Sequence, residues 1–273
     1  KNNIKILFNR TRDKKIRVLQ DIKSKIIFLE KNFNKPKNYI DNSDKYYLKI
    51  FKTIKKKKFL DDDVKRFNFF KKEIKNKKIL DYGCGFGGFL SLTKGISKKS
   101  EGYEMMKICQ NYIIKKNLFK LNTQKSDLKD KKFDKIFLFH VLEHMPDQLK
   151  ELKYLRGLLK KGGKLIVEVP HSLDILIENK DLNSFKEFTF WSEHLILHTY
   201  RSLKTVLFKS GFKKVNIQYY QRYNFSNHLG WFLKRKPGGH KYYKEIISDS
   251  LNSSYCENLK KLGQTDTLIA IAE

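Results

Sequence analysis

The chain has 273 residues, and its 59 Lys and Arg residues against 29 Asp and Glu residues give a formal charge of +30. Most of the positive charge is lysine (51 Lys and 8 Arg), and because Arg is preferred for bidentate contacts with phosphates and bases, the composition does not favour nucleic acid as a partner. A hydrophobic share of 40% excludes wholesale disorder, and no stretch approaches the roughly 20 apolar residues of a membrane span.

The first quarter of the chain shows the spacing of amphipathic helices. Apolar residues recur at three- and four-residue steps over 14–31, 44–58 and 61–75. The third segment opens with three acids, which the helix dipole favours at an N-terminus. No strand pattern is visible there. We therefore predict that residues 1–75 form a basic helical extension that caps the domain following it.

From residue 77 the pattern changes to short apolar runs that alternate with helical segments, which is typical of a parallel sheet with helical crossovers. In chain order we predict strand 77–83, helix 86–96, strand 100–104, helix 105–116, strands 121–126 and 135–141, helix 147–160, strand 164–170, helix 200–210, and strands 213–220 and 266–273. No crossover helix is evident directly before the last run, so we expect the last two strands to pair antiparallel across an irregular insertion at 222–264. The sequence thus predicts one α/β domain over 76–273.

A glycine-rich turn follows the first of these strands. Residues 81–87 read Asp-Tyr-Gly-Cys-Gly-Phe-Gly, and glycines in such a turn permit positive φ and a close approach of the backbone to a ligand. In dinucleotide enzymes the same kind of turn holds a pyrophosphate, which an acid before the first glycine would repel. Asp81 occupies that place, so the turn favours a cationic or zwitterionic ligand.

Two further acids follow the next two strands. Glu104 ends the second strand, where its carboxylate can accept hydrogen bonds from both hydroxyls of a ribose. Asp127 follows the third strand, where it can accept a hydrogen bond from an exocyclic amine. The combination is more specific than a glycine-rich turn alone.

At these residues the sequence resembles class I S-adenosylmethionine-dependent methyltransferases. The segments DYGCGFGG, GYE and KSD are similar to the cofactor motifs of that family, and FDKIFLFHVLEHMPD followed by LKKGGKLIVEVP is similar to the later motifs of its small-molecule branch. The resemblance implies a Rossmann-like, mostly parallel seven-stranded sheet in the order 3-2-1-4-5-7-6, with the last strand antiparallel. It also implies S-adenosyl-L-methionine as the cofactor.

The resemblance assigns roles residue by residue. The cofactor-binding residues that it implies are Asp81, Gly83, Gly85, Glu104, Met105, Asp127, Phe139 and His140. The two glycines would line the methionine moiety, Glu104 would hold the ribose, and Asp127 would accept from the adenine amine with Met105 against the ring. The Phe-His pair at the end of the fourth strand would flank the sulfonium.

All seven histidines lie between residues 140 and 240, beyond the carboxyl ends of the predicted strands, where substrates of open α/β sheets bind. Methyl transfer to a hydroxyl needs a base, and histidine is usable at neutral pH. We take His171, His194 and His140 as candidate catalytic residues, each with a structural hydrogen bond as the alternative. His194 and His198 are four residues apart, as two metal ligands on a helix would be, but no third ligand is identifiable. Glu143 and His144 are a second, minor candidate, because the resemblance extends to quinone-pathway methyltransferases that bind a divalent cation near this motif. We expect no metal.

The segment after the sixth strand mixes amide, imidazole and aromatic side chains, which suit a polyhydroxylated or ring-shaped acceptor. The predicted substrate-binding residues are Tyr223, Asn227, His228 and Trp231. Arg222 and Lys234 to Lys236 lie beside them and favour an anionic acceptor. This part of the chain loosely resembles bacterial methyltransferases encoded among genes of sugar and surface-polysaccharide biosynthesis.

The sequence therefore predicts a methyltransferase that O-methylates a small-molecule acceptor, a phosphorylated or nucleotide-linked sugar or related metabolite, by in-line displacement with a histidine base. Two alternatives stay open: an RNA methyltransferase that uses the basic N-terminal helices, and a cofactor-binding protein without catalysis. The three cysteines form no CxxC pair, which fits a reducing compartment, and we expect a cytoplasmic protein.

Overall fold

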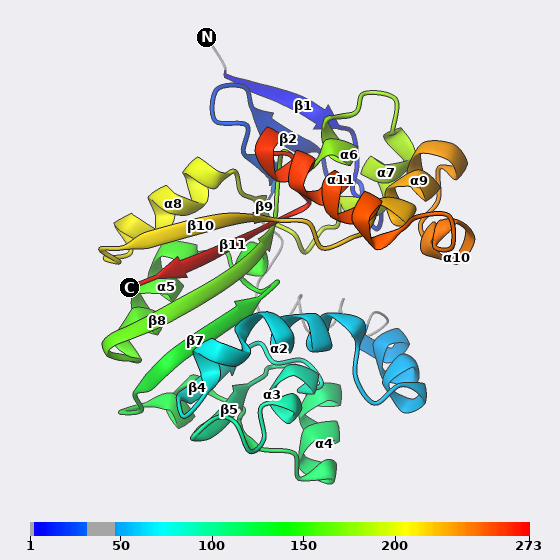
Figure 1. The fold of residues 1–273 in the computed structure, drawn as a ribbon. Coiled ribbons are helices and arrows are strands. Elements are labelled where there is room, and N and C mark those ends of the chain that lie inside the picture. The colour runs from blue at the N-terminus through cyan, green and yellow to red at the C-terminus, as the bar shows by residue number, and fades with distance from the viewer. Residues whose placement is uncertain (1–2, 32–46) are drawn as a thin grey trace.

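A seven-stranded sheet forms the centre of the molecule in the computed structural model, which describes residues 3–31 and 47–273 (Figure 1). Its strands lie in the order β10-β11-β8-β7-β4-β5-β6, and among these described strands β11 runs in the direction opposite to the other six. The strands are β4 (Lys78–Tyr82), β5 (Lys99–Tyr103), β6 (Lys120–Asn122), β7 (Phe133–Phe139), β8 (Leu159–Pro170), β10 (Val215–Tyr220) and β11 (Thr267–Ala272). The predicted Rossmann-like order and the antiparallel pair at its end are confirmed.

Helices cover both faces of this sheet (Figure 1). One face carries α2 (Asp61–Ile74), α3 (Gly88–Leu92) and α4 (Lys107–Lys116), and the other carries α5 (Gln148–Gly157) and α8 (Tyr200–Lys209). The rings of Phe70 in α2 and Phe89 in α3 both pack against Phe137 of β7. The central residues of β7 are buried from both sides, as expected of an inner parallel strand. Among the described residues, no helix combines the length and the apolar character that crossing a membrane requires.

A second, four-stranded antiparallel sheet has the order β1-β2-β3-β9, and its strands β1 and β2 lie at the top of Figure 1. Its strands are β1 (Ile4–Phe8), β2 (Val18–Asp21), β3 (Ile27–Leu29) and β9 (Ile196–Leu197). Helices α6 (Ile175–Glu178), α7 (Asn183–Thr189) and α9 (Phe225–Lys234) pack on it. Val18 and Ile27 point into this second core, where Trp231 of α9 also lies.

The helix predicted over 14–31 is wrong, because this segment forms β2, a turn and β3. In the turn, Oδ1 of Asp21 accepts a hydrogen bond from the backbone N–H of Ser24 (2.6 Å), and Lys25 has a φ of 60°. The apolar residues of β2 and β3 happen to recur at the three- and four-residue steps that are typical of a helix. The competing signals were the β-branched residues and the Asp-x-x-Ser turn.

The other two helices predicted in the first quarter are present. Residues 47–56 are helical, residues 44–46 lie outside the described part of the chain, and α2 matches the third prediction. Phe70 and Ile74 of α2 belong to the core on one face of the large sheet. The division of the chain at residue 75 stays a prediction.

The segment 222–264 is helical, not irregular as predicted. It forms α9, α10 (His240–Tyr243) and α11 (Asp249–Leu262), and α11 leads directly into β11. The hydroxyl of Ser248 caps α11 by accepting from the N–H of Leu251, and Gly263 ends the helix with a φ of 65°. Within α11 only Leu259 is buried, so the sequence lacks the wide apolar stripe by which such a helix is recognised.

Candidate active site

The glycine turn after β4 has the backbone conformation that the sequence predicted. Gly83 and Gly85 have φ values of 86° and 54°, in the left-handed region that disfavours other residues. A Cβ at Gly83 would lie 2.6 Å from Cγ2 of Val141, so the turn also needs glycine for packing. A Cβ at Gly85 would meet nothing within 4 Å. The backbone at Gly85 is therefore open to a ligand.

Asp81 lies at the end of β4, below this turn. Its side chain is buried, and its Oδ1 atom has no hydrogen-bond partner within the protein. Burial raises the pKa of Asp81 to about 8, and the charge of Arg66 offsets only part of that effect. An unpartnered buried carboxyl oxygen is suited to receive a positively charged ligand group.

Glu104 follows β5 and joins the strand end to the glycine turn. Its Oε2 accepts from the N–H of Gly85 (2.7 Å), and its Oε1 accepts from the N–H groups of Met105 (2.7 Å) and Met106 (2.8 Å). Burial raises the pKa of Glu104, although these three donors favour the charged form. Each carboxylate oxygen has two acceptor sites, and three of the four are filled, so Oε2 can accept one further hydrogen bond from a ribose hydroxyl.

Asp127 lies on the surface in the 3-10 helix η1 (Lys125–Leu128). Its Oδ2 accepts from the N–H groups of Thr123 (2.9 Å) and Gln124 (3.0 Å), and these bonds lower the pKa of Asp127. Met105, directly after Glu104, is partly exposed. The strand ends β4, β5 and β6 thus present one glycine turn and three acids along one edge of the sheet.

His140 directly follows β7 and has a φ of 56°. Its Nδ1 lies 3.0 Å from Oε1 of Glu143, and its Nε2 lies 3.0 Å from Oε1 of Glu168 and 3.2 Å from Nη1 of Arg222. Burial and Arg222 lower the pKa of His140, but the bonds to the two glutamates outweigh them and raise it. Because Nε2 cannot donate to Glu168 and accept from Arg222 at once, we assign it as a donor to Glu168.

Two arginines complete the cluster at this end of the sheet. Arg66 of α2 donates to both oxygens of Glu168 in β8, with the shortest contact at 2.6 Å, and its guanidinium lies 4.6 Å from the ring of Phe139. Arg222, after β10, forms a bidentate pair with Asp62 of α2. Burial alone would raise the pKa of Asp62, but the charge and hydrogen bonds of Arg222 lower it to about 2.

Arg66, Asp62 and Glu168 could not be recognised as site residues from the sequence. The acids that open α2 and the Arg one turn later were visible as helix-end signals, but nothing in the sequence indicated what they would face. The structure brings them to the carboxyl ends of β7 and β8, next to His140.

The remaining histidines lie in different surroundings. His171 is buried, its Nδ1 donates to the carbonyl of Thr265 (2.9 Å), and burial lowers its pKa to about 4. His198 bonds through Nε2 to Gln148 (2.8 Å) and through Nδ1 to Ser202 (3.0 Å). Burial lowers the pKa of His194 to about 3. His171 and His194 are therefore neutral at pH 7 and weak bases, and their catalytic roles stay predictions.

The sequence matches the family described as Methyltransferase domain over residues 53–217. The chain belongs to this methyltransferase family. Among solved structures, a SAM-dependent methyltransferase from Archaeoglobus fulgidus is similar, with 21% identity, a TM-score of 0.54, and coverage of 82% of this chain and 98% of that one. The cyclopropane synthase MmaA2 from Mycobacterium tuberculosis is similar with 13% identity, a TM-score of 0.50, and coverage of 77% and 84%. A comparison with curated proteins found no match.

S-adenosylmethionine is the expected cofactor of this methyltransferase, and the residues at the strand ends suit it. The unpartnered oxygen of Asp81 can accept from the ammonium group of the methionine moiety. Glu104 has one unfilled acceptor site, on Oε2, for a ribose hydroxyl, and the backbone at Gly85 is open. These individual roles stay predictions that rest on the chemistry of the donor set.

The predicted acceptor residues of the methyltransferase are separated by the structure. Tyr223 is 45% exposed, whereas His228 and Trp231 are buried. His228 bonds to the hydroxyl of Tyr255 (2.8 Å), and Trp231 packs against Phe185. Asn227 is partly buried, and its Oδ1 has no hydrogen-bond partner. Of the four, Tyr223 is thus the one most open to an acceptor.

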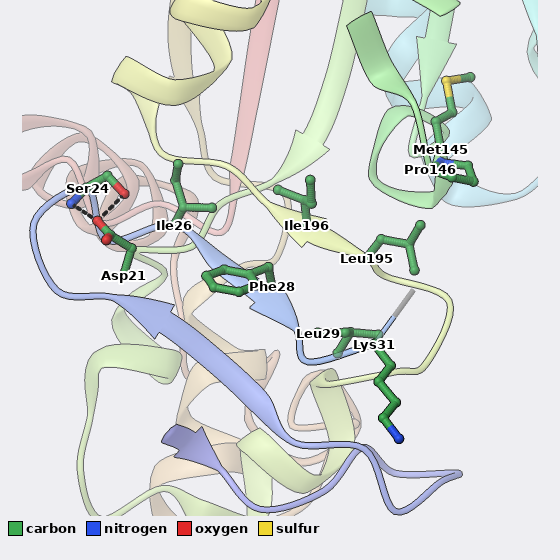
Figure 2. A pocket seen from close by; sticks show the side chains of 10 residues that line it. All are labelled: Asp21, Ser24, Ile26, Phe28, Leu29, Lys31, Met145, Pro146, Leu195 and Ile196. Atoms are coloured by element: carbon green, nitrogen blue, oxygen red, sulfur yellow. Dashed lines mark hydrogen bonds between the residues drawn. The ribbon is translucent and has the colours of Figure 1, made fainter. Parts of the chain in front are cut away.

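A groove of about 470 Å³ lies between the four-stranded sheet and the turn that follows β7 (Figure 2). It is lined by Asp21, Ser24, Ile26, Phe28, Leu29, Lys31, Met145, Pro146, Leu195 and Ile196. Most of these side chains are apolar. Met145 and Leu195 of the lining directly follow His144 and His194 in the chain.

Proposed function

We propose that this methyltransferase transfers the methyl group of S-adenosylmethionine to a hydroxyl of a small anionic metabolite, in the class of phosphorylated or nucleotide-linked sugars. The reaction would be an in-line displacement at the sulfonium carbon, in which the hydroxyl oxygen forms the new bond and S-adenosylhomocysteine leaves. The proton of the hydroxyl must then pass to a base.

The observation that carries the proposal is the setting of His140. His140 directly follows β7. The last residue of that strand, Phe139, packs against Phe89 of α3, the helix that follows the glycine turn. Nδ1 of His140 is held by the buried carboxylate of Glu143, so Nε2 is the nitrogen that faces the strand ends. A base oriented through its other nitrogen is the arrangement that proton abstraction needs. Nε2 carries a proton while it donates to Glu168, so the acceptor hydroxyl would replace Glu168 and His140 would lose that proton before Nε2 acts as the base.

The anionic character of the acceptor is supported by Arg66 and Arg222. Both guanidinium groups are mostly buried beside His140, and both pair with carboxylates of the protein itself. A phosphate or carboxylate of the acceptor could exchange with one of those carboxylates, because Arg binds planar oxyanions in a bidentate manner.

The test is a methyl-transfer assay with S-adenosylmethionine labelled on its methyl group, with nucleotide sugars, sugar phosphates, their uncharged counterparts and RNA as acceptors. We expect label in an anionic small acceptor, with an equal amount of S-adenosylhomocysteine formed. Label that enters RNA alone would contradict the proposal and support the RNA alternative.

Two variants sharpen this test. Asn can adopt the positive φ of His140, so His140→Asn should keep the backbone in place. We expect this variant to lower kcat by about 10²- to 10⁴-fold and to bind S-adenosylhomocysteine as the wild type does. His240→Asn, at an exposed histidine, is the matched control. Arg222→Met should raise KM for the anionic acceptor more than for its uncharged counterpart. Wild-type turnover of His140→Asn would rule out this base.

A further inference from the structure

Glu143, His144 and His194 form a cluster that the proposed reaction does not use as a unit. Glu143 and His144 belong to the 3-10 helix η2 (Leu142–His144), and His194 lies in the turn before β9. The N–H of Leu195 donates to the carbonyl of Glu143 (2.8 Å), which joins the two segments. One ligand atom from each of the three side chains lies within 4.8 Å of the other two.

The carboxylate of Glu143 is only partly satisfied by the protein. It is fully buried, and Oε1 is bonded to Nδ1 of His140 (3.0 Å). Its Oε2 is buried and has no hydrogen-bond partner in the described structure. A buried charged oxygen without a partner is costly, so this atom indicates a positively charged ligand beside it.

The two imidazoles are held in the manner of metal-binding histidines. The carbonyl of Glu193 accepts from Nδ1 of His144 (2.8 Å), which fixes the orientation of that ring. The rings of His144 and His194 lie edge to face with centroids 4.9 Å apart, and Trp191 packs against His194 at 5.6 Å.

We propose that Glu143, His144 and His194 bind one divalent transition-metal ion of the zinc class. Two imidazole nitrogens and one carboxylate oxygen are a donor set that zinc accepts, whereas magnesium and calcium require oxygen ligands. Ligand atoms about 2.0–2.2 Å from a tetrahedral zinc ion are roughly 3.4 Å apart, so the three atoms must approach one another by up to about 1.4 Å. Rotation of the side chains can supply that movement.

The cluster replaces the expectation of no metal; it contains Glu143 and His144, the minor candidate of the sequence, and joins His194 to them without His198. His198, the partner expected for His194, has both ring nitrogens engaged by Gln148 and Ser202. Residues 194 and 198 do not lie on one helix, because the strand β9 separates them. Three protein ligands leave a coordination position for water or another ligand. Metal binding here does not depend on the identity of the acceptor.

The experiment uses the full chain after dialysis against a chelator. It is titrated with Zn²⁺ by calorimetry and with Co²⁺ by visible absorption, since tetrahedral Co²⁺ absorbs more strongly than the octahedral aqua ion. We expect one equivalent of either ion. Glu143→Gln, His144→Ala and His194→Ala should each weaken binding by at least about tenfold, whereas His240→Ala, at an exposed histidine, should bind as the wild type does.

As a control, circular dichroism and binding of S-adenosylhomocysteine would test whether each variant is folded. His194 is only partly buried, so His194→Ala provides the readout if Glu143→Gln does not fold. The proposal is overturned if no equivalent of Zn²⁺ or Co²⁺ binds, if all three cluster variants bind as tightly as the wild type, or if His240→Ala abolishes binding. Because the readout is metal binding, none of these outcomes bears on methyl transfer.

Discussion

Arg66 of α2 donates to both carboxylate oxygens of Glu168 in β8, so a helix from the first quarter of the chain is joined to a central strand by a buried ion pair. The side chains are 16% and 3% exposed. This pair, with the contact of Arg66 on Phe139, fixes α2 over the strand end where His140 lies.

Loss of Arg66 should therefore destabilise the protein strongly. Arg66→Met leaves Glu168 buried without its main partner, which we expect to lower the free energy of unfolding by about 3–5 kcal/mol in urea denaturation. Replacing both partners, in Arg66→Met with Glu168→Leu, should recover part of that loss, because no lone charge is then buried. Arg10→Met, in the exposed pair with Glu187, should leave the midpoint nearly unchanged. A loss below about 1 kcal/mol in Arg66→Met would contradict this account.

Binding of the cofactor should release a proton through Asp81. Its pKa of about 8 in the free protein means that the carboxyl is largely protonated at pH 7, and a cationic ligand group favours the ionised form. Affinity for S-adenosylhomocysteine should rise with pH between about 6 and 8, by up to tenfold per pH unit, and level off above about 8. Calorimetry in buffers of different ionisation enthalpy measures the released proton. Asp81→Asn should bind S-adenosylhomocysteine more weakly, and its affinity should not rise with pH in this range. If the affinity of Asp81→Asn still rose with pH as in the wild type, the released proton would come from another group.

Gly83 should tolerate no side chain. In Gly83→Ala the Cβ meets Val141 at 2.6 Å and the residue must keep a φ of 86°, so we expect a loss of stability above about 1 kcal/mol together with weaker cofactor binding. Adding Val141→Ala should relieve the clash but not the backbone strain, and so restore only part of the loss. Gly157→Ala is the matched control, because it has open space and lies in helix α5, where Ala should stabilise by about 0.5–1 kcal/mol.

Asp127 should determine recognition of the adenine amine. If its carboxylate accepts from that group, the protein will prefer S-adenosylhomocysteine to its deaminated, inosine-containing analogue, and Asp127→Ala will bring the ratio of the two affinities close to one. Glu257→Ala, at another exposed acid, should leave the ratio unchanged. Competition binding with the two compounds measures it. A ratio that persists in Asp127→Ala would show that another group reads the amine.

The position of the predicted cofactor residues at one edge of the sheet could be predicted, because the sequence signals for these residues are local. The glycine turn, Glu104 and Asp127 each follow directly after a strand, and parallel strands bring their carboxyl ends to one edge whatever the rest of the chain does. The family resemblance implied the strand order, and the apparent lack of a crossover helix before the last strand suggested the antiparallel pair; the structure confirms both.

The other side of the site depends on contacts between distant segments. Arg66 and Asp62 lie at the site because α2 packs over β8 and the end of β10. The residue pattern of 61–75 does not indicate which strands this helix packs against. His194 joins Glu143 and His144, and not His198, because a bond from Leu195 to Glu143 sets its place. The strands β2 and β3 were mistaken for a helix for the same reason, since their pairing and burial come from β9 and α9.

The pairing of Ile27 with Leu197 also governs the order in which the molecule can assemble. The first thirty residues leave the ribosome long before β9 does, so the edge of β3 has no partner from β9 until the first five strands of the large sheet have been synthesised. That pairing is a long-range contact, which makes its formation slow relative to the local crossovers. The turn that carries His194 can reach its final position only when this last strand closes the smaller sheet. The surroundings of His194 should therefore mature after the cofactor edge.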